Sequence, residues 1–214
     1  MATLGDIRTI ATAKMQDTGY GSNTEAEYTT AINEAQRTIQ ELTKLLYKTS
    51  YASSVDGTQE YSKPTDYMAL YPYNGDESVY YYDSDSNRKE MQYASYQYLK
   101  ESYTDFLTAT GTPGYFYLKE SEIGFYKIPD FDGSSNIYIE HYYYPTTLSA
   151  TSDISDIPDK YKYATAYLAC SLISAINKIY SDVGYFDNMF NKTLHDVSII
   201  DDINTAKGIK IGNV

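Results

Sequence analysis

The sequence predicts an α+β fold with a four-helix core, an inserted antiparallel β module and an extended C-terminal arm. Three observations support this class. Apolar residues recur with the helical period near both ends of the chain, short aromatic and β-branched runs replace that period in the middle, and no sustained period remains at the C-terminus. The predicted segments are residues 1–46 and 151–198 for the two halves of the helical core, 47–150 for the β module and 199–214 for the arm.

Two helices are predicted in the first half of the helical core. Thr3 is a candidate N-cap for a short helix that ends near Gln16. Thr24-Glu25-Ala26-Glu27 is a capping box, which predicts a longer helix ending near Leu46. The apolar stripes are Leu4, Ile7, Ile10, Ala11 and Met15 in the first helix, and Tyr28, Ala31, Ala35, Ile39, Leu42 and Leu46 in the second.

The β module is predicted from alternation and turn residues. Tyr115–Leu118 and Ile123–Ile128 form a hairpin, and a turn after Pro129 leads to a third strand at Ile137–Tyr144, which together make a meander. An earlier strand covers Ser78–Tyr82, and a short helix lies between Arg88 and Phe106. Alternation in the third strand separates two faces: Tyr138, Glu140, Tyr142 and Tyr144 on one, and Ile137, Ile139, His141 and Tyr143 on the other.

Two further helices complete the core. Pro158 fits the first turn of a helix that runs to about Asp182, and Gly184 interrupts the pattern before a fourth helix. The third helix has the apolar seam Tyr161, Ala164, Leu168, Leu172, Ala175 and Ile179, and the fourth has Phe186, Phe190, Leu194 and Val197.

Charge and composition exclude several classes of protein. A net charge of −12 disfavours tight wrapping of nucleic acid, which needs clustered Lys and Arg. The first ten residues lack the apolar core of a signal peptide and no stretch could span a bilayer, so we expect a protein made in the host cytoplasm with no membrane partner. The single Cys170 has apolar neighbours and is expected to be a buried thiol. The 27 tyrosines suit partly wet contact surfaces, although an AT-rich genome would enrich Tyr as well.

No constellation of catalytic, cofactor-binding or metal-binding residues is found. The chain has no phosphate-binding loop, no nucleophile elbow and no paired Cys, and the two histidines, His141 and His195, are expected to be satisfied at a surface or an interface. Residues 83–87 begin like a calcium loop, but Arg88 and Ala94 stand where Gly and a bidentate Glu are required. Asp153, Asp156 and Asp159 are expected to favour a helix N-terminus. We therefore expect that the protein is not an enzyme.

Four segments, in this order, resemble the head-to-tail adaptor, or connector, proteins of tailed phages. They are residues 3–7 with 32–36, residues 63–67, residues 111–117 leading to 123–130, and residues 142–149 followed by 156–161. Together they span most of the chain, and their order is more specific than any one of them.

The resemblance implies a virion structural protein in the phage neck. Such adaptors form a closed ring, typically of twelve copies, which joins the portal to the tail and continues a channel through which genomic DNA passes without specific binding. Their β module faces neighbouring subunits or tail proteins, and their C-terminal arm docks onto the portal. On this basis the expected portal-binding residues are Ile199, Ile200, Ile203, Ile209 and Ile211, and the expected subunit or tail contacts are Tyr115, Tyr117, Tyr138, Tyr142 and Tyr144.

Two alternatives remain open at this point. The chain could be another tail or head-completion protein of the virion, with a different symmetry. It could also be a carbohydrate-binding module, because exposed tyrosine rings can stack on sugars.

Overall fold

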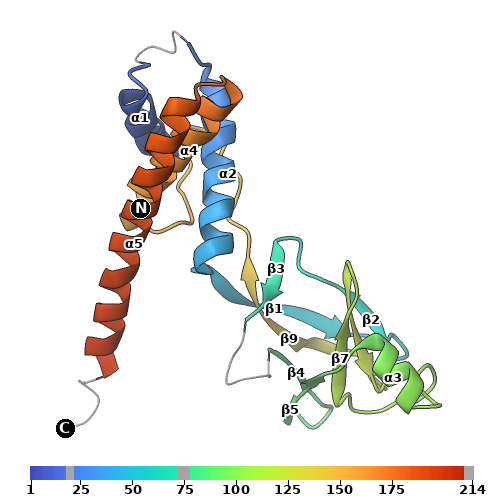
Figure 1. The fold of residues 1–214 in the computed structure, drawn as a ribbon. Coiled ribbons are helices and arrows are strands. Elements are labelled where there is room, and N and C mark those ends of the chain that lie inside the picture. Colours follow the sequence, from blue (N-terminus) through green and yellow to red (C-terminus); the bar gives the residue numbers. More distant parts are fainter. Residues whose placement is uncertain (18–21, 72–77, 210–214) are drawn as a thin grey trace. The chain divides into compact units, whose positions relative to one another are not determined.

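The computed structural model describes residues 1–17, 22–71 and 78–209, with side chains described as far as Val197. The chain forms two compact units, and Figure 1 shows their elements. Met1–Leu46 and Pro145–Val214 form the helical unit, and Tyr47–Tyr144 form the β unit. The predicted α+β class is confirmed.

The helical unit is built around its fourth α-helix. Its elements are α1 (Leu4–Lys14), α2 (Glu25–Thr43), the 3₁₀ turn η1 (Asp159–Tyr161), α4 (Lys162–Ile176) and α5 (Tyr180–Ile209). The central helix α4 packs against α1, α2 and α5. Small side chains such as Ala164, Ala166 and Ala169 are fully buried, and they allow the neighbouring helices to approach closely.

Both predicted N-caps are confirmed. Thr3 accepts from the Asp6 backbone N–H, and the Asp6 carboxylate accepts from the Thr3 N–H. Thr24 and Glu27 make the same reciprocal pair at the start of α2. Because α2 ends where Lys44 adopts a left-handed backbone with φ of 52°, the helix stops before the predicted Leu46.

The boundary between the last two helices differs from the prediction. The break falls before α5, where α4 ends at Ile176 and Lys178 has a φ of 60°. Gly184 lies inside α5, and a single glycine lowers helix stability without ending a helix. The described backbone also stays helical to Ile209, so the expected extended arm is wrong for residues 199–209, because that stretch has no proline to break the helical ladder.

The β unit contains two sheets that share one core. The first sheet has the strand order β1 (Tyr47–Ser54), β9 (Gly133–Tyr143), β4 (Val79–Tyr82) and β5 (Arg88–Glu90), and β3 (Tyr67–Leu70) also pairs with β9. The second has the order β2 (Glu60–Ser62), β8 (Glu122–Tyr126), β7 (Tyr115–Leu118) and β6 (Gln92–Tyr93). The short helix α3 (Tyr96–Ser102) lies within the predicted range.

The core between the sheets is aromatic and aliphatic. Val79, Tyr81, Ile137 and Ile139 from the first sheet pack with Phe116, Ile123 and Phe125 from the second. The predicted hairpin of β7 and β8 is confirmed, but the predicted meander is wrong, because β9 pairs with β1, β3 and β4. Pro129, which cannot donate to a ladder, lies in the segment that leaves β8, and β9 then packs its inner face over the second sheet.

Candidate interaction surfaces

The two faces of β9 have different environments, as the alternation predicted. Ile137 and Ile139 are buried in the core between the sheets, whereas Tyr138 and Tyr142 point to the other side and are half-buried. The register with the neighbouring strands pairs Tyr138 with Tyr51 of β1 and with Tyr80 of β4. Tyrosines from three strands are thereby aligned on the outer face of the first sheet.

These aligned rings form the tyrosine face, which we define as Tyr47, Tyr51, Tyr71, Tyr80, Tyr82, Tyr138 and Tyr142. The ring of Tyr138 lies at its centre, 4.7 Å from the rings of both Tyr51 and Tyr80. Near the end of the sheet, the Tyr71 ring stacks on Tyr47 at 4.4 Å and meets Tyr142 edge-on at 5.3 Å. Each ring is held by its neighbours, so the face is rigid and loses little entropy when a partner covers it.

A cation lies against one ring of the tyrosine face. The guanidinium of Arg88 lies 4.1 Å from the centre of the Tyr80 ring. Burial, followed by the charge of Glu140, raises the pKa of Tyr80. Tyr47 and Tyr51 are 59 % and 60 % exposed, so the surface offers large aromatic rings, which are features of protein–protein contacts.

The structure separates the five tyrosines expected at an interface. Tyr138 and Tyr142 belong to the tyrosine face, and Tyr144 is half-buried one residue beyond β9. Tyr115 is half-buried on β7 in the other sheet, where its ring lies 6.1 Å from that of Tyr103. Tyr117 also lies on β7, and the structure places it in the core.

The burial of Tyr117 has a clear physical reason. Strand β7 is covered on both sides, because Phe116 faces the core between the sheets and Tyr117 faces a second core beneath α3. The Tyr117 hydroxyl donates to a Glu60 carboxylate oxygen at 2.8 Å, which satisfies its polar tip. Burial and the Glu60 charge both raise the pKa of Tyr117. Alternation alone could not reveal that both faces of this strand are covered.

His141 is buried inside the β unit, whereas the sequence suggested a satisfied histidine at a surface or an interface. It is 0 % exposed, its Nε2 lies 2.9 Å from the Ser50 hydroxyl, and its Nδ1 lies 3.0 Å from the Tyr142 carbonyl oxygen. Burial lowers the pKa of His141. Both ring nitrogens are thus engaged, and the contact of Nε2 with Ser50 joins β9 to β1.

The residues that begin like a calcium loop form a tight turn between β4 and β5. The Asp83 carboxylate accepts from the backbone N–H groups of Asp85 and Asn87, and these bonds lower its pKa. Within the part of the chain whose side chains are described, no group of three His, Cys, Asp or Glu residues could hold a metal ion.

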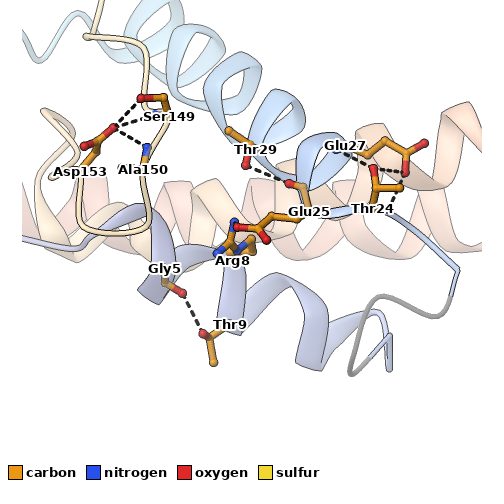
Figure 2. Close-up of polar contacts among 10 residues, drawn as sticks. All are labelled: Gly5, Arg8, Thr9, Thr24, Glu25, Glu27, Thr29, Ser149, Ala150 and Asp153. Carbon is orange, nitrogen blue, oxygen red and sulfur yellow. Dashed lines mark hydrogen bonds and ion pairs between the residues drawn. The ribbon is translucent and has the colours of Figure 1, made fainter.

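A loop after β9 fastens the halves of the helical unit, and Figure 2 shows the contacts of Asp153 within this loop. The Asp153 carboxylate accepts from the Ser149 and Ala150 N–H groups at 2.7 and 2.8 Å, and these bonds lower its pKa. The backbone carbonyl of Asp153 accepts from the Leu4 N–H, which has no partner within α1 because it lies in the first turn. Asp153 therefore caps a loop and not the following helix.

A second set of contacts in Figure 2 joins α1 to α2. Arg8, which is 7 % exposed, pairs with the carboxylate of Glu25 in the first turn of α2. The pair fixes the relative position of the two N-terminal helices. The buried Cys170 also meets this region, because its thiol donates to the Ala11 carbonyl oxygen, and burial raises the pKa of that thiol to about 12. The expectation of a buried thiol is confirmed.

An apolar groove lies between α2 and α4. It has a volume of about 470 Å³ and is lined by Ala26, Glu27, Thr30, Ala31 and Glu34 of α2 and by Leu172, Ala175 and Ile176 of α4. Ile176 is 68 % exposed. The apolar seam predicted for the third helix is buried in its first half, at Tyr161, Ala164 and Leu168. Farther along α4, Leu172 and Ala175 instead border the groove.

Several residues of these surfaces were missed in the sequence. No strand was predicted at residues 47–54, so Tyr47 and Tyr51 were not singled out. The i, i+4 spacing of two tyrosines around Thr49 was a usable signal, since equal parity places residues on one face of a strand. Tyr80 and Tyr82 lay in a predicted strand, but only the register with β9 shows that they meet Tyr138.

The expected portal-binding residues lie at or beyond the end of what the structure describes. Ile199, Ile200, Ile203 and Ile209 fall within the helical backbone of α5, but their side chains are not described. Ile211 lies outside the described residues.

Comparison with known proteins gave one positive finding. The family model of the SU10 adaptor protein matches residues 2–208 of the chain, which covers both units. A search of curated proteins gave no match. Among the helices whose residues the structure describes, none is long and apolar enough to cross a membrane.

Proposed function

Because the chain belongs to the SU10 adaptor protein family, we propose that it forms a ring in the virion neck, joining the portal to the tail and continuing the DNA channel. Membership of this family makes the chain a phage structural adaptor and confirms the resemblance drawn from its four segments. The ring, its number of subunits and its position in the channel are the proposal. We propose twelve copies, a location in the neck after synthesis in the host cytoplasm, and no catalytic role.

The match over residues 2–208 is the observation that carries this proposal. It includes both units, so the family assignment applies to the helical unit as well as to the β unit. Both units offer surfaces suited to other proteins: the tyrosine face on one and the apolar groove on the other. A head-to-tail ring needs two unlike surfaces on each subunit, and a joint between portal and tail needs further surfaces.

The charge of the chain supports passage of DNA without specific binding. With 17 basic and 29 acidic residues, each subunit is strongly anionic at neutral pH. Phosphates are repelled by such a surface, so DNA would slide past it and not adhere.

We assign the tail or subunit contacts to Tyr115, Tyr138, Tyr142 and Tyr144, with the other tyrosines of the tyrosine face. Carbohydrate binding is the weaker reading of these rings. The faces of Tyr80 and Tyr138 are stacked on each other with an interplanar angle of 21°, so neither ring presents both faces to a flat sugar.

We assign the portal contact to the C-terminal isoleucines, namely Ile199, Ile200, Ile203, Ile209 and Ile211. In the helical part of this stretch, apolar side chains three and four residues apart would give a partner one face to bind.

Electron microscopy of the purified protein mixed with the portal of its phage tests the proposal. We expect a closed ring on the portal, with a count that gives the subunit number. A protein that stays monomeric and never binds the portal would overturn the proposal.

Truncation after Ser198 tests the portal contact. Loss of portal binding with an unchanged melting temperature is expected, because the buried core of the helical unit ends at Val197 in the described side chains. Binding that survives the truncation would remove this part of the proposal.

A further inference from the structure

We propose that the apolar groove between α2 and α4 receives the outer face of α5 from a second copy of this chain, and that this contact closes the ring. The inference rests on the proposed function, since it names the partner for the ring that the adaptor forms. Its occupant is a definite stripe on α5, which we call the α5 stripe: Ser181, Gly184, Tyr185, Asn188 and Lys192.

The groove has an apolar floor and an acidic rim. Its floor is formed by Leu172, Ala175 and Ile176 of α4 with the alanines of α2. Its rim carries the carboxylates of Glu27 and Glu34, both on exposed residues of α2. Ile176 at 68 % exposed is among the most exposed large apolar side chains of the helical unit, and burial against a partner would remove that surface from water.

The α5 stripe has the complementary chemistry. Its five residues are all exposed and follow the helical spacing i, i+3, i+4, i+7 and i+11, so they lie on one side of α5. Tyr185, which is 57 % exposed, can fill the apolar floor, and Lys192 can reach a carboxylate on the rim.

Gly184 is the residue whose presence this contact explains. A Cβ at Gly184 would meet nothing within 4 Å in its own subunit, so nothing in the subunit requires a glycine there. Glycine in the interior of a helix lowers its stability relative to alanine. A helix from another subunit could approach closely only if no side chain stood at this position, and only glycine leaves the backbone uncovered there.

The arrangement of the helices makes the contact heterologous. The central α4 packs against α2 on the groove side and against α5, so one rigid unit carries both the groove and the stripe. A groove on one copy that binds a stripe on the next repeats from subunit to subunit. Such a contact closes into a ring when the rotation that relates neighbouring subunits is a whole-number fraction of a full turn.

Cysteine cross-linking tests the contact directly. One preparation carries Ile176→Cys and another carries Tyr185→Cys, and the two are mixed with the portal under mild oxidation. The native thiol does not interfere, because Cys170 is buried and its pKa is raised to about 12. We expect disulfide-linked heterodimers at least tenfold in excess over homodimers. A matched control replaces Tyr185→Cys with Thr9→Cys, which is exposed on α1 and lies outside the α5 stripe, so it should not cross-link.

Two sets of substitutions separate docking from folding. Gly184→Leu should leave the melting temperature unchanged or raise it, since the site is open and leucine favours a helix, yet it should abolish ring formation. Thr9→Leu, at an exposed position of α1, is the matched control and should leave rings intact. Glu34→Lys and Lys192→Glu should each reduce assembly at least tenfold, and the double variant should recover most of it.

The outcomes distinguish this inference from the proposed function. If rings form on the portal but the heterodimers are absent and Gly184→Leu assembles normally, the groove contact is wrong and the ring stands. If the wild-type chain never assembles with a portal, both are wrong. Heterodimers, together with the loss in Gly184→Leu, would support both.

Discussion

The helical unit and the β unit keep their cores together by different means. In the helical unit, distant segments are joined by buried polar pairs: the Ser155 hydroxyl donates to Gln36 Oε1 at 2.5 Å, and Asn33 exchanges two hydrogen bonds with the backbone of Leu148. In the β unit, the core between the sheets is dominated by large apolar side chains, including Tyr81, Phe116 and Phe125.

Within the β unit, tyrosine serves two purposes. Tyr117 is a core residue whose hydroxyl is satisfied by Glu60, whereas Tyr138 is a surface residue whose ring is fixed by other rings. The same residue type therefore fills a core in the second sheet and forms part of an outer face in the first. Predictions for each unit follow from how its core is closed.

The largest effect is expected in the β unit at Gly124. A Cβ at this position would lie 2.1 Å from Cζ of Tyr117, and that ring cannot move freely because its hydroxyl is bonded to Glu60. Gly124→Ala should lower the free energy of unfolding by about 3 kcal/mol, as overpacked cores do. Denaturant titration, monitored by tyrosine fluorescence, measures this loss of free energy of unfolding. Gly114→Ala is the control, because a Cβ there would meet nothing within 4 Å. Equal stability of the two variants would show that the β core adapts.

In the helical unit, Ser155→Ala should cost about 2 kcal/mol. Its hydroxyl donates to Gln36 and accepts from the Ile157 N–H, and both partners would lose a buried hydrogen bond. Ser152→Ala, at an exposed position of the same loop, serves as control. The measurement is the urea midpoint of helix content by circular dichroism. A wild-type midpoint for Ser155→Ala would indicate that packing, and not polar pairing, joins the segments.

A smaller effect is expected from mild acid at His141 of the β unit. Burial lowers the pKa of His141, so the unfolded chain takes up this proton at a higher pH than the folded chain. The contribution is fully favourable above the unfolded pKa of about 6.5 and is lost as pH falls towards the folded value. Lys48 and Asp66 are the charged neighbours. Midpoints at pH 7.5 and 5.5 should differ less in His141→Gln than in the wild type; an equal difference would assign the acid sensitivity to other groups.

The smallest effect is expected on the tyrosine face. Arg88→Ala removes the contact with the Tyr80 ring and a 3.5 Å ion pair with Glu90, both at an exposed edge strand. The expected loss is about 0.5 kcal/mol. Lys89→Ala, on the other side of the same strand, is the control. If the face binds partners as proposed, Arg88→Ala should change partner binding more than the melting temperature, and a large thermal shift would contradict this separation.

Local sequence signals were sufficient for much of the fold. Capping boxes at Thr3 and Thr24, the hairpin around residues 119–121 and the alternation in β9 are decided by neighbours within a few residues, so the sequence alone determined them. Family membership was likewise carried by short segments in a fixed order, and the family model confirmed it.

Tertiary structure decided what neighbours in sequence could not. β9 pairs with strands far away in the chain, so the predicted meander was wrong. Tyr117 and His141 are buried because other elements cover them. Tyr51 and Tyr80 join Tyr138 only through strand register. Local propensity acts over one turn or one hairpin, whereas register and burial depend on which distant surfaces exclude water together, and that choice is made by the packed core as a whole.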